Sequence, residues 1–325
     1  MKVLLTGANG FVGSHVLDRL RAKDVPTAVL LRPSSDKSLI LPHLASVEVH
    51  TGTVIDRESL HRAMAGITHV IHCAGLTKAR RRAEFFEVNE GGTRNLVEAV
   101  NAQSNAPRLL HISSLAAIGP AGAAHPARET DTPHPVSEYG RSKLAAELAV
   151  RELCRAEFVI IRPPAVYGPR DSAFLSLFKA IKSHVLPLTS ASQALSLVFV
   201  ADLAGAIVAC LDHPVARGKA YFASASEITT GRGMAEEIAA QMGCWTIPCP
   251  MPTVMLWPAC FFGEVWSHLT RKPRMVNLQK FAELRAPGWV CDASLLQREV
   301  GYECKTRLKE GIAQALTWYR EKGWL

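Results

Sequence analysis

The sequence predicts an α/β protein with a doubly wound parallel sheet, followed by a small mixed C-terminal lobe. Short apolar runs alternate with segments of helical spacing from residue 2 to about residue 165, a pattern typical of parallel βαβ units. The first run leads through a glycine-rich turn into a helix, which is how such units begin. After residue 165 prolines interrupt the chain repeatedly, which favours a less regular lobe.

The alternation defines the elements in order. Apolar runs predict strands at 2–6, 27–32, 47–50, 69–73, 108–113 and 158–162. Helical spacing predicts helices at 12–23, 56–65, 84–103 and 137–154, with two more at 203–211 and about 306–322. The stretch 245–269 is rich in aromatic residues and methionine but is interrupted by prolines. We interpret it as a core-facing helix, a substrate pocket or an interfacial surface, not as a membrane span.

The turn between the first strand and the first helix contains Gly7, Gly10 and Gly13. Glycines let the backbone turn tightly and approach a pyrophosphate closely, and the following helix N-terminus offers unpaired N–H groups. Strand, glycine turn and helix in this order predict a dinucleotide site.

Tyr139 and Lys143 form a second motif, because positions i and i+4 lie on one face of a helix. A nearby ammonium group favours phenolate over phenol and lowers the pKa of a tyrosine from its usual value of about 10. The pair therefore predicts a proton donor and acceptor that works near neutral pH.

The two motifs together resemble those of the extended short-chain dehydrogenase/reductase family, which includes NAD-dependent epimerases and dehydratases and 3β-hydroxysteroid dehydrogenases. The spacing G-x-x-G-x-x-G is that of the family, and further matches lie at 70–75, 88–93, 111–114, 162–169, 199–204 and 318–319. The resemblance implies a Rossmann dinucleotide-binding domain at 1–165, with returning segments at about 196–224 and 306–322. It implies a substrate-binding lobe built from 166–195 and 225–305.

The resemblance also implies the roles of individual residues. Ser114 would hold the substrate oxygen, Tyr139 would transfer the proton there, and Lys143 would support the tyrosine and bind the nicotinamide ribose; Ser113 remains an alternative to Ser114. Asn89 would stabilise the active-site backbone, unless it is a plain helical asparagine. The implied cofactor site consists of Gly7, Asn9, Gly10, Phe11, Val12, Gly13, Arg32, Ser35, Thr53, Val54, Cys73, Ala74, Gly75, Ser113, Tyr139, Lys143, Pro163 and Val166.

Arg32 favours NADP over NAD as the cofactor. NAD-specific relatives carry an acidic residue at this strand end to bind the ribose 2′-OH, whereas an arginine matches a 2′-phosphate in shape and charge. NAD remains open, because Asp36 could turn toward the ribose or Arg32 could stack on adenine. Thr53 stands where relatives carry an aspartate, which leaves the adenine contact weaker.

The expected reaction is hydride transfer to or from a hydrophobic hydroxy/keto compound that is steroid-, terpenoid- or lipid-like. Leu115 and Ala116 replace the acidic pair that sugar dehydratases of the family carry, which argues against dehydration. The alternative is a nucleotide-sugar 4-epimerase, whose substrate would need cations; the candidates are Arg170, Arg271, Arg274 and Arg285. A non-catalytic NAD(P)-sensing protein is a third possibility.

The composition of the chain limits the kinds of partner that it is expected to bind. The net charge is +8, but the basic residues are dispersed except at 78–82 and aromatic residues do not interleave with them, which argues against nucleic acid. Residues 78–82 are either a solvated helix start or a neighbour of the cofactor or of an anionic substrate. Eight cysteines without metal-ligand spacing and an N-terminus unlike a signal peptide indicate a cytoplasmic protein without a metal site. Peripheral membrane contact stays open, and the resemblance implies a homodimer formed through helices 84–103 and 137–154.

Overall fold

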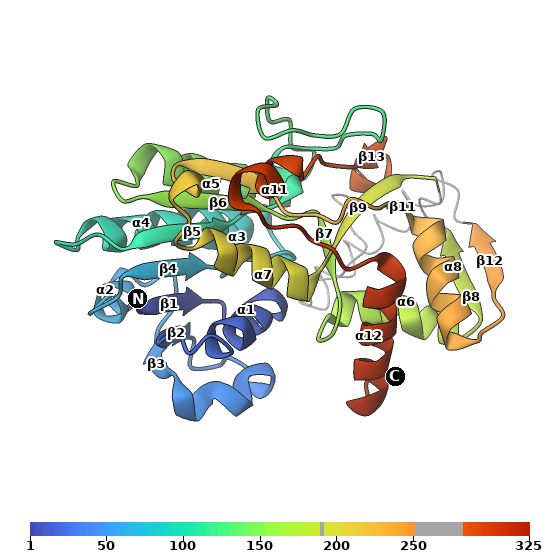
Figure 1. Cartoon of the computed structure of the whole chain (residues 1–325), viewed down its shortest axis with the longest axis horizontal. Coiled ribbons are helices and arrows are strands. Elements are labelled where there is room, and N and C mark those ends of the chain that lie inside the picture. The colour runs from blue at the N-terminus through green and yellow to red at the C-terminus, as the bar shows by residue number, and fades with distance from the viewer. Residues whose placement is uncertain (189–191, 251–281) are drawn as a thin grey trace.

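A seven-stranded parallel sheet forms the centre of the larger part of the molecule in the computed structural model, which describes residues 1–188, 192–250 and 282–325 (Figure 1). From one edge to the other its strands are β10 (Lys219–Phe222), β6 (Phe158–Arg162), β5 (Arg108–Ile112), β4 (His69–His72), β1 (Val3–Thr6), β2 (Thr27–Leu31) and β3 (Glu48–Thr51). The order reverses between β1 and β4, which makes the sheet doubly wound. In such sheets a ligand binds outside the carboxyl ends of the strands at this reversal. The predicted fold and all six predicted strands are confirmed.

Helices cover both faces of the sheet because successive strand residues point to opposite sides. Leu5 packs in one core cluster and Leu4 in the other. The first cluster includes residues of α1 (Phe11–Arg21), α7 (Val200–Cys210) and α11 (Ser294–Val300). The second includes residues of α2 (Arg57–Ala63), α4 (Gly92–Asn101) and α5 (Glu138–Leu153). Short 3-10 turns lie at η1 (Ser38–Ser46), η3 (Leu115–Ala117) and η4 (Pro214–Ala216).

The small lobe has a core of its own. Its mixed sheet contains β7 (Ala165–Tyr167), β9 (Ala194–Phe199), β11 (Ile228–Thr230) and β13 (Gly288–Trp289), and beside it β8 (Val185–Leu188) pairs in parallel with β12 (Ile247–Pro250). The helices α6 (Ser172–Lys182), α8 (Gly231–Met242) and α12 (Leu308–Glu321) share one hydrophobic cluster with β7 and β9. Figure 1 places these elements together at the end of the molecule away from β1–β3.

The last helix corrects one expectation about the domains. We expected residues 306–322 to return to the first sheet, but α12 packs Ile312, Leu316 and Tyr319 against the lobe helices. The hydroxyl of Tyr319 donates to the carbonyls of Gly168 and Asp171, at 3.1 and 2.7 Å, which ties α12 to the start of α6. The segment that returns to the sheet is α11, whose Leu296 lies in the first core cluster.

The predicted helix 84–103 is interrupted. It consists of α3 (Arg82–Phe85), a π-helical turn η2 (Phe86–Gly91) and α4. Asn89 lies in the π turn and is buried. Such turns are rare and frequently mark functional sites.

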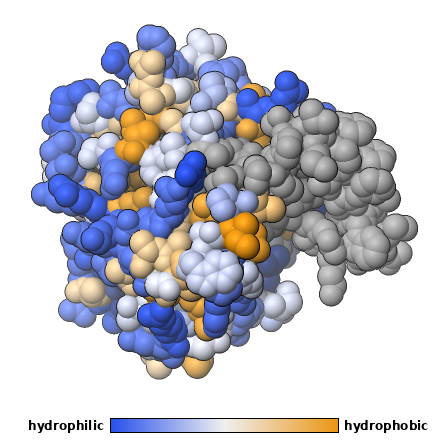
Figure 2. Space-filling model, turned by 90° about the vertical axis from the view of Figure 1, so that its right-hand side faces the viewer, coloured by the Kyte–Doolittle hydropathy of each residue, from blue (hydrophilic) through white to orange (hydrophobic). Residues whose placement is uncertain are grey.

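The apolar stretch 245–269 is described only as far as residue 250; the rest lies outside the described residues. Trp245 and Ile247 are 65% and 62% exposed, so the core-facing interpretation is wrong for these two residues. On the face drawn in Figure 2, which looks onto the small lobe, hydrophilic side chains dominate and hydrophobic ones are exposed at separate places. None of the helices in the described residues combines the length and apolar character needed to cross a membrane.

Candidate active site

The predicted cofactor residues gather at one edge of the sheet. They follow the carboxyl ends of β1, β2, β3, β4, β5 and β6, which are neighbours in the sheet, and Val166 lies on β7 beside Val198 of β9. In order along the chain they are Gly7 to Gly13, Arg32 and Ser35, Thr53 and Val54, Cys73 to Gly75, Ser113, and Pro163 with Val166. The topology therefore brings together residues that lie far apart in the sequence.

The glycine turn leaves room for backbone alone. Gly7 has φ of +72°, and a Cβ there would lie 2.7 Å from the nitrogen of Ala74. A Cβ on Gly13 would lie 2.1 Å from the oxygen of Gly7, so α1 can approach the turn only with glycine at that position. Among the described residues no side chain caps the N-terminus of α1 at Gly10. Its free N–H groups and its partial positive charge suit a pyrophosphate.

The end of β2 supplies the residues that would meet the adenosine ribose. Arg32 is exposed directly after the strand, and the nitrogen of Ser35 donates to its carbonyl at 3.0 Å. Asn9 of the glycine turn donates to the carbonyl of Asp36 at 3.1 Å, which fixes this loop beside the turn. The carboxylate of Asp36 accepts the N–H of Ser38 at 2.9 Å, which lowers its pKa. That side chain is thus used in its own turn.

Asn89 holds the backbone after β4. Its side-chain oxygen accepts the N–H of Leu76 at 2.7 Å, and its side-chain nitrogen donates to the Leu76 carbonyl at 3.0 Å and to Ser142 Oγ at 2.9 Å. Because Ser142 precedes Lys143 on α5, Asn89 joins the β4 loop to the helix that carries the predicted catalytic residues. A Cβ on Gly75 would lie 3.0 Å from Asn89 Oδ1 and 3.9 Å from Lys143 Nζ, so all three meet at one point. These contacts are more than a plain helical asparagine makes.

The structure brings Ser114 and Tyr139 together. A Cβ on Gly140 would lie 2.3 Å from the carbonyl of Ala116, so this glycine allows α5 to pack directly on η3. The Ser114 hydroxyl lies close enough to the phenol of Tyr139 to lower its pKa through hydrogen bonding, and the ring of Tyr139 lies 6.2 Å from that of Phe85. Ser113, in contrast, is buried and donates to Glu147 Oε1 at 2.5 Å. Ser114 is therefore the serine that faces the tyrosine.

The pKa of Tyr139 differs from our expectation. Burial raises it, the hydrogen bond with Ser114 lowers it, and the charge of Glu283 raises it further, so that the net change is upward. The predicted lowering by Lys143 was wrong for the described side chains. Lys143 is itself buried and donates to the carbonyl of Ile112 at 2.5 Å. Burial lowers the pKa of Lys143 to about 8, against the charge of Glu147, which raises it.

A buried ion pair lies next to the candidate active site, and we did not predict it from the sequence. Arg162 donates to both oxygens of Glu147, with the shortest distance 2.6 Å from Nη2 to Oε2. Their side chains are 4% and 1% exposed. Glu147 also accepts from Ser113. One signal was present in the sequence: Tyr139, Lys143 and Glu147 follow one another at intervals of four, which puts a buried carboxylate on the same helix face.

Of the four cations expected for a nucleotide diphosphate, the structure describes Arg170 and Arg285. Arg170 Nη2 binds Asp18 Oδ2 on α1 at 2.8 Å. Arg285 is exposed, and Arg271 and Arg274 lie outside the described residues. Of residues 78–82, α3 begins at Arg82, as one interpretation predicted, and Arg82 binds Glu138, the neighbour of Tyr139, at 2.9 Å. Among the described lobe residues, the acidic Glu283 raises the pKa of Tyr139.

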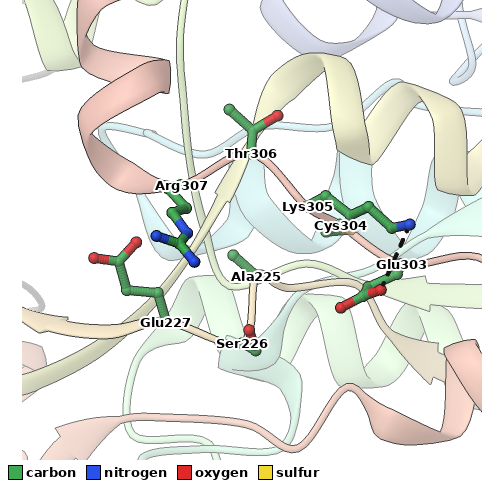
Figure 3. A pocket seen from close by; sticks show the side chains of 8 residues that line it. All are labelled: Ala225, Ser226, Glu227, Glu303, Cys304, Lys305, Thr306 and Arg307. Atoms are coloured by element: carbon green, nitrogen blue, oxygen red, sulfur yellow. Dashed lines mark ion pairs between the residues drawn. The ribbon is translucent and has the colours of Figure 1, made fainter.

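A hollow in the surface is lined by other residues (Figure 3). Its volume is about 570 Å³, and it is lined by residues on both sides of the contact between Ala225 and Cys304. Figure 3 shows Glu227 and Arg307 on one side and the exposed ion pair of Glu303 with Lys305, 3.9 Å apart, on the other. None of the predicted site residues lines it. Within the described residues, no His, Cys, Asp and Glu side chains are grouped so as to hold a metal ion.

Comparison with known proteins gives a consistent picture. A model of the NAD dependent epimerase/dehydratase family matches residues 3–223. The ceramide reductase of Caulobacter vibrioides is 32% identical over 99% of this chain and 96% of its own length. The UDP-glucose 4-epimerase of Vibrio cholerae is 28% identical over 96% and 93%. The structure of Thermus thermophilus UDP-glucose 4-epimerase in complex with NAD has a TM-score of 0.78 at 24% identity, over 98% of this chain and 99% of that one.

Proposed function

Since the chain belongs to the NAD dependent epimerase/dehydratase family, and is thus an extended short-chain oxidoreductase, we propose that it transfers hydride between a nicotinamide cofactor and a hydrophobic hydroxy/keto substrate, in the first place a long-chain lipid. The site residues fit the cofactor, because the glycine turn admits only backbone and the N-terminus of α1 has no side-chain cap among the described residues. The relatives whose activity is named are enzymes, so a non-catalytic sensing role has no support.

The surroundings of Ser114 and the similarity to known enzymes carry the choice of substrate. Of the cations considered for a diphosphate, Arg170 is bound to Asp18. Leu115 packs in the protein core, whereas Ala116 is partly exposed and apolar, which also suits an apolar substrate. Similarity to a ceramide reductase over almost the whole chain supports the same choice.

Each residue of the site has its own role in the reaction. For reduction, Ser114 Oγ and Tyr139 Oη donate hydrogen bonds to the substrate carbonyl oxygen. As the carbonyl carbon accepts hydride, that oxygen takes the proton of Tyr139. The ammonium of Lys143, which donates to the Ile112 carbonyl in the described structure, then turns toward the phenolate and stabilises it. Asn89 keeps α5 and the β4 loop in place. The bound nicotinamide supplies the hydride.

The pKa of Lys143 predicts how reduction depends on pH. Burial lowers that pKa to about 8, so the side chain is a cation below this pH and loses its charge above it. Only the cation stabilises the phenolate, so kcat/KM for reduction should fall as pH rises through about 8. Initial rates measured from mildly acidic to strongly alkaline pH test this, and a rate that stays constant throughout contradicts the role of Lys143.

NADP as the preferred cofactor is the finer part of the proposal, and Arg32 is its basis. Arg32→Asp removes the charge that would bind the 2′-phosphate and supplies a carboxylate for a 2′-OH. The ratio of kcat/KM with NADPH to kcat/KM with NADH should fall by about tenfold or more, since a hydrogen bond to a charged group contributes about 1.5–3 kcal/mol. Lys23→Asp makes the same change in charge after the other end of α1 and should leave the ratio unaltered. An unaltered ratio in Arg32→Asp would show that Arg32 does not select the cofactor.

The first experiment distinguishes the reductase from the 4-epimerase, which similarity to a UDP-glucose 4-epimerase keeps as the second candidate. Purified protein receives NADPH or NADH with long-chain and steroidal ketones, and separately NAD with UDP-sugars. Oxidation of the cofactor in proportion to ketone consumed supports the proposal. Inversion of a UDP-sugar without net change in absorbance at the nicotinamide band, and no ketone reduction, overturns it.

The remaining proposals concern the protein's surroundings. We propose a homodimer through α4 and α5, supported by Leu148 and Leu153 of α5, which are 44% and 39% exposed. Light scattering on the purified chain tests this, and a monomer at micromolar concentration contradicts it. The divisions at residues 165, 195 and 225 and a cytoplasmic location remain predictions, which limited proteolysis and cell fractionation would test.

A further inference from the structure

A buried histidine, His72, lies next to the candidate active site, and its hydrogen-bond partners fix which of its ring nitrogens carries the proton. His72 ends β4 and is fully buried. Its Nδ1 lies 2.8 Å from Thr6 Oγ1, and its Nε2 lies 3.0 Å from Thr93 Oγ1. Thr93 Oγ1 in turn donates to the carbonyl of Asn89 at 2.6 Å. A carbonyl only accepts, so the single hydroxyl proton of Thr93 is used there.

The proton of the imidazole follows from this. Since Thr93 can only accept from His72, the hydrogen must be on Nε2. A neutral imidazole has one N–H, so Nδ1 is an acceptor and receives the hydroxyl proton of Thr6. Thr6 Oγ1 also accepts the N–H of Ala74 at 3.3 Å. The neutral Nε2–H tautomer thus satisfies every donor in a chain that runs in one direction from Ala74 to Asn89. Burial and the charge of Lys143 lower the pKa of His72 to about 3, which agrees with a neutral ring.

The chain of hydrogen bonds joins three parts of the site. Thr6 ends β1 and directly precedes the glycine turn, and Ala74 precedes Gly75 in the β4 loop. Asn89 holds Ser142, the residue before Lys143. We propose that His72 is a positioning residue, which as the Nε2–H tautomer fixes Asn89 and the catalytic helix α5 relative to the cofactor turn. Its effect on turnover depends on the proposed function, whereas its tautomer does not.

A neighbouring histidine provides the matched control. His111 on β5 is as deeply buried as His72, and their rings lie 5.3 Å apart. Neither of its ring nitrogens has a hydrogen-bond partner among the described residues. If burial alone mattered, changes at either histidine would act alike; if the directed hydrogen bonds matter, only the His72 chain would affect the site.

Two measurements test the proposal. Long-range proton–nitrogen NMR on the full chain should find His72 as the Nε2–H tautomer across the pH range in which the protein stays folded. Titration of the facing Lys143 should not change it, and the facing His111, whose pKa burial lowers, stays neutral. Thr93→Val removes the hydroxyl at nearly constant shape and should lower kcat by about tenfold, the order expected for a small misplacement of catalytic groups, while the dissociation constant of NADPH rises less. Thr93→Ser should retain most of kcat, and His111→Leu should retain it as well.

The outcomes distinguish a failure of the His72 proposal from a failure of the proposed function. A Nδ1–H or charged His72 overturns the proposal, and so does Thr93→Val with kcat equal to that of Thr93→Ser. If no ketone is reduced at all, the proposed function fails, but the tautomer and the NADPH affinities still decide the role of His72. If Thr93→Val unfolds, the serine variant and the wild-type tautomer remain as tests.

Discussion

Replacing Tyr139 with phenylalanine is expected to abolish turnover while the protein still binds its cofactor. The change removes one oxygen and keeps the ring that lies beside Phe85. A positioned acid contributes about 10²–10⁴ to the rate, and Ser114 alone cannot replace it, because a serine hydroxyl is a far weaker acid than a phenol. We therefore expect kcat to fall by about 10³, within that range. The dissociation constant of NADPH should change by less than about threefold, which is under about 1 kcal/mol.

The control for this variant is Tyr302→Phe. Tyr302 packs against Gly205 of α7, away from Ser114 and Lys143, and loses the same oxygen. Steady-state rates and a fluorescence titration with NADPH compare the two variants. If Tyr139→Phe retains the wild-type kcat, proton transfer does not use this phenol and the assignment of the site is wrong.

Replacing Arg162 with methionine is expected to have the largest effect on stability. Glu147 would remain buried without its cation, 1% exposed and with the hydroxyl of Ser113 still donating to it. Breaking a buried ion pair in this way costs about 3–5 kcal/mol of unfolding free energy. The double variant Arg162→Met, Glu147→Leu should recover much of the loss, because neither member of the pair is left buried without its partner. Urea denaturation of the wild type and both variants measures this.

A solvent-exposed ion pair provides the control for that measurement. Arg217 and Glu157 are 2.7 Å apart, nearly the distance of the buried pair, but both side chains are about half exposed to solvent. Arg217→Met should therefore cost at most about 1 kcal/mol. Equal losses in Arg162→Met and Arg217→Met would contradict a structural role for the buried pair.

The sequence predicted the larger part of the fold because its central strands are buried on both faces. A strand such as β2 is apolar along most of its length whatever its neighbours are, so the local pattern suffices. The last helix was harder, because its apolar face would fit either the first sheet or α6 and α8. The carbonyls of Gly168 and Asp171, which accept from Tyr319, decide between them, and they lie 151 and 148 positions away.

The candidate site was predictable where its motifs are local. Gly7, Tyr139 and Lys143 belong to motifs whose spacing along the chain is enough to predict a dinucleotide site and a proton donor. The structure places all three residues at the same edge of the sheet. The partners of Ser113 and Asn89 were not predictable, because they come from contacts between distant segments. The pKa of Tyr139 was predicted wrongly since the motif reports a nearby cation but not the depth of burial, which dominates.

The most direct test of the central claim follows the hydride itself. The protein is incubated with a long-chain ketone and NADPH that carries deuterium at C4 of the nicotinamide, in each of the two configurations. We expect one configuration to deliver deuterium to the carbinol carbon of the product, in an amount equal to the NADP formed. No deuterium in any product, together with inversion of UDP-glucose at C4 without net NADP, would contradict the account and identify the chain as an epimerase.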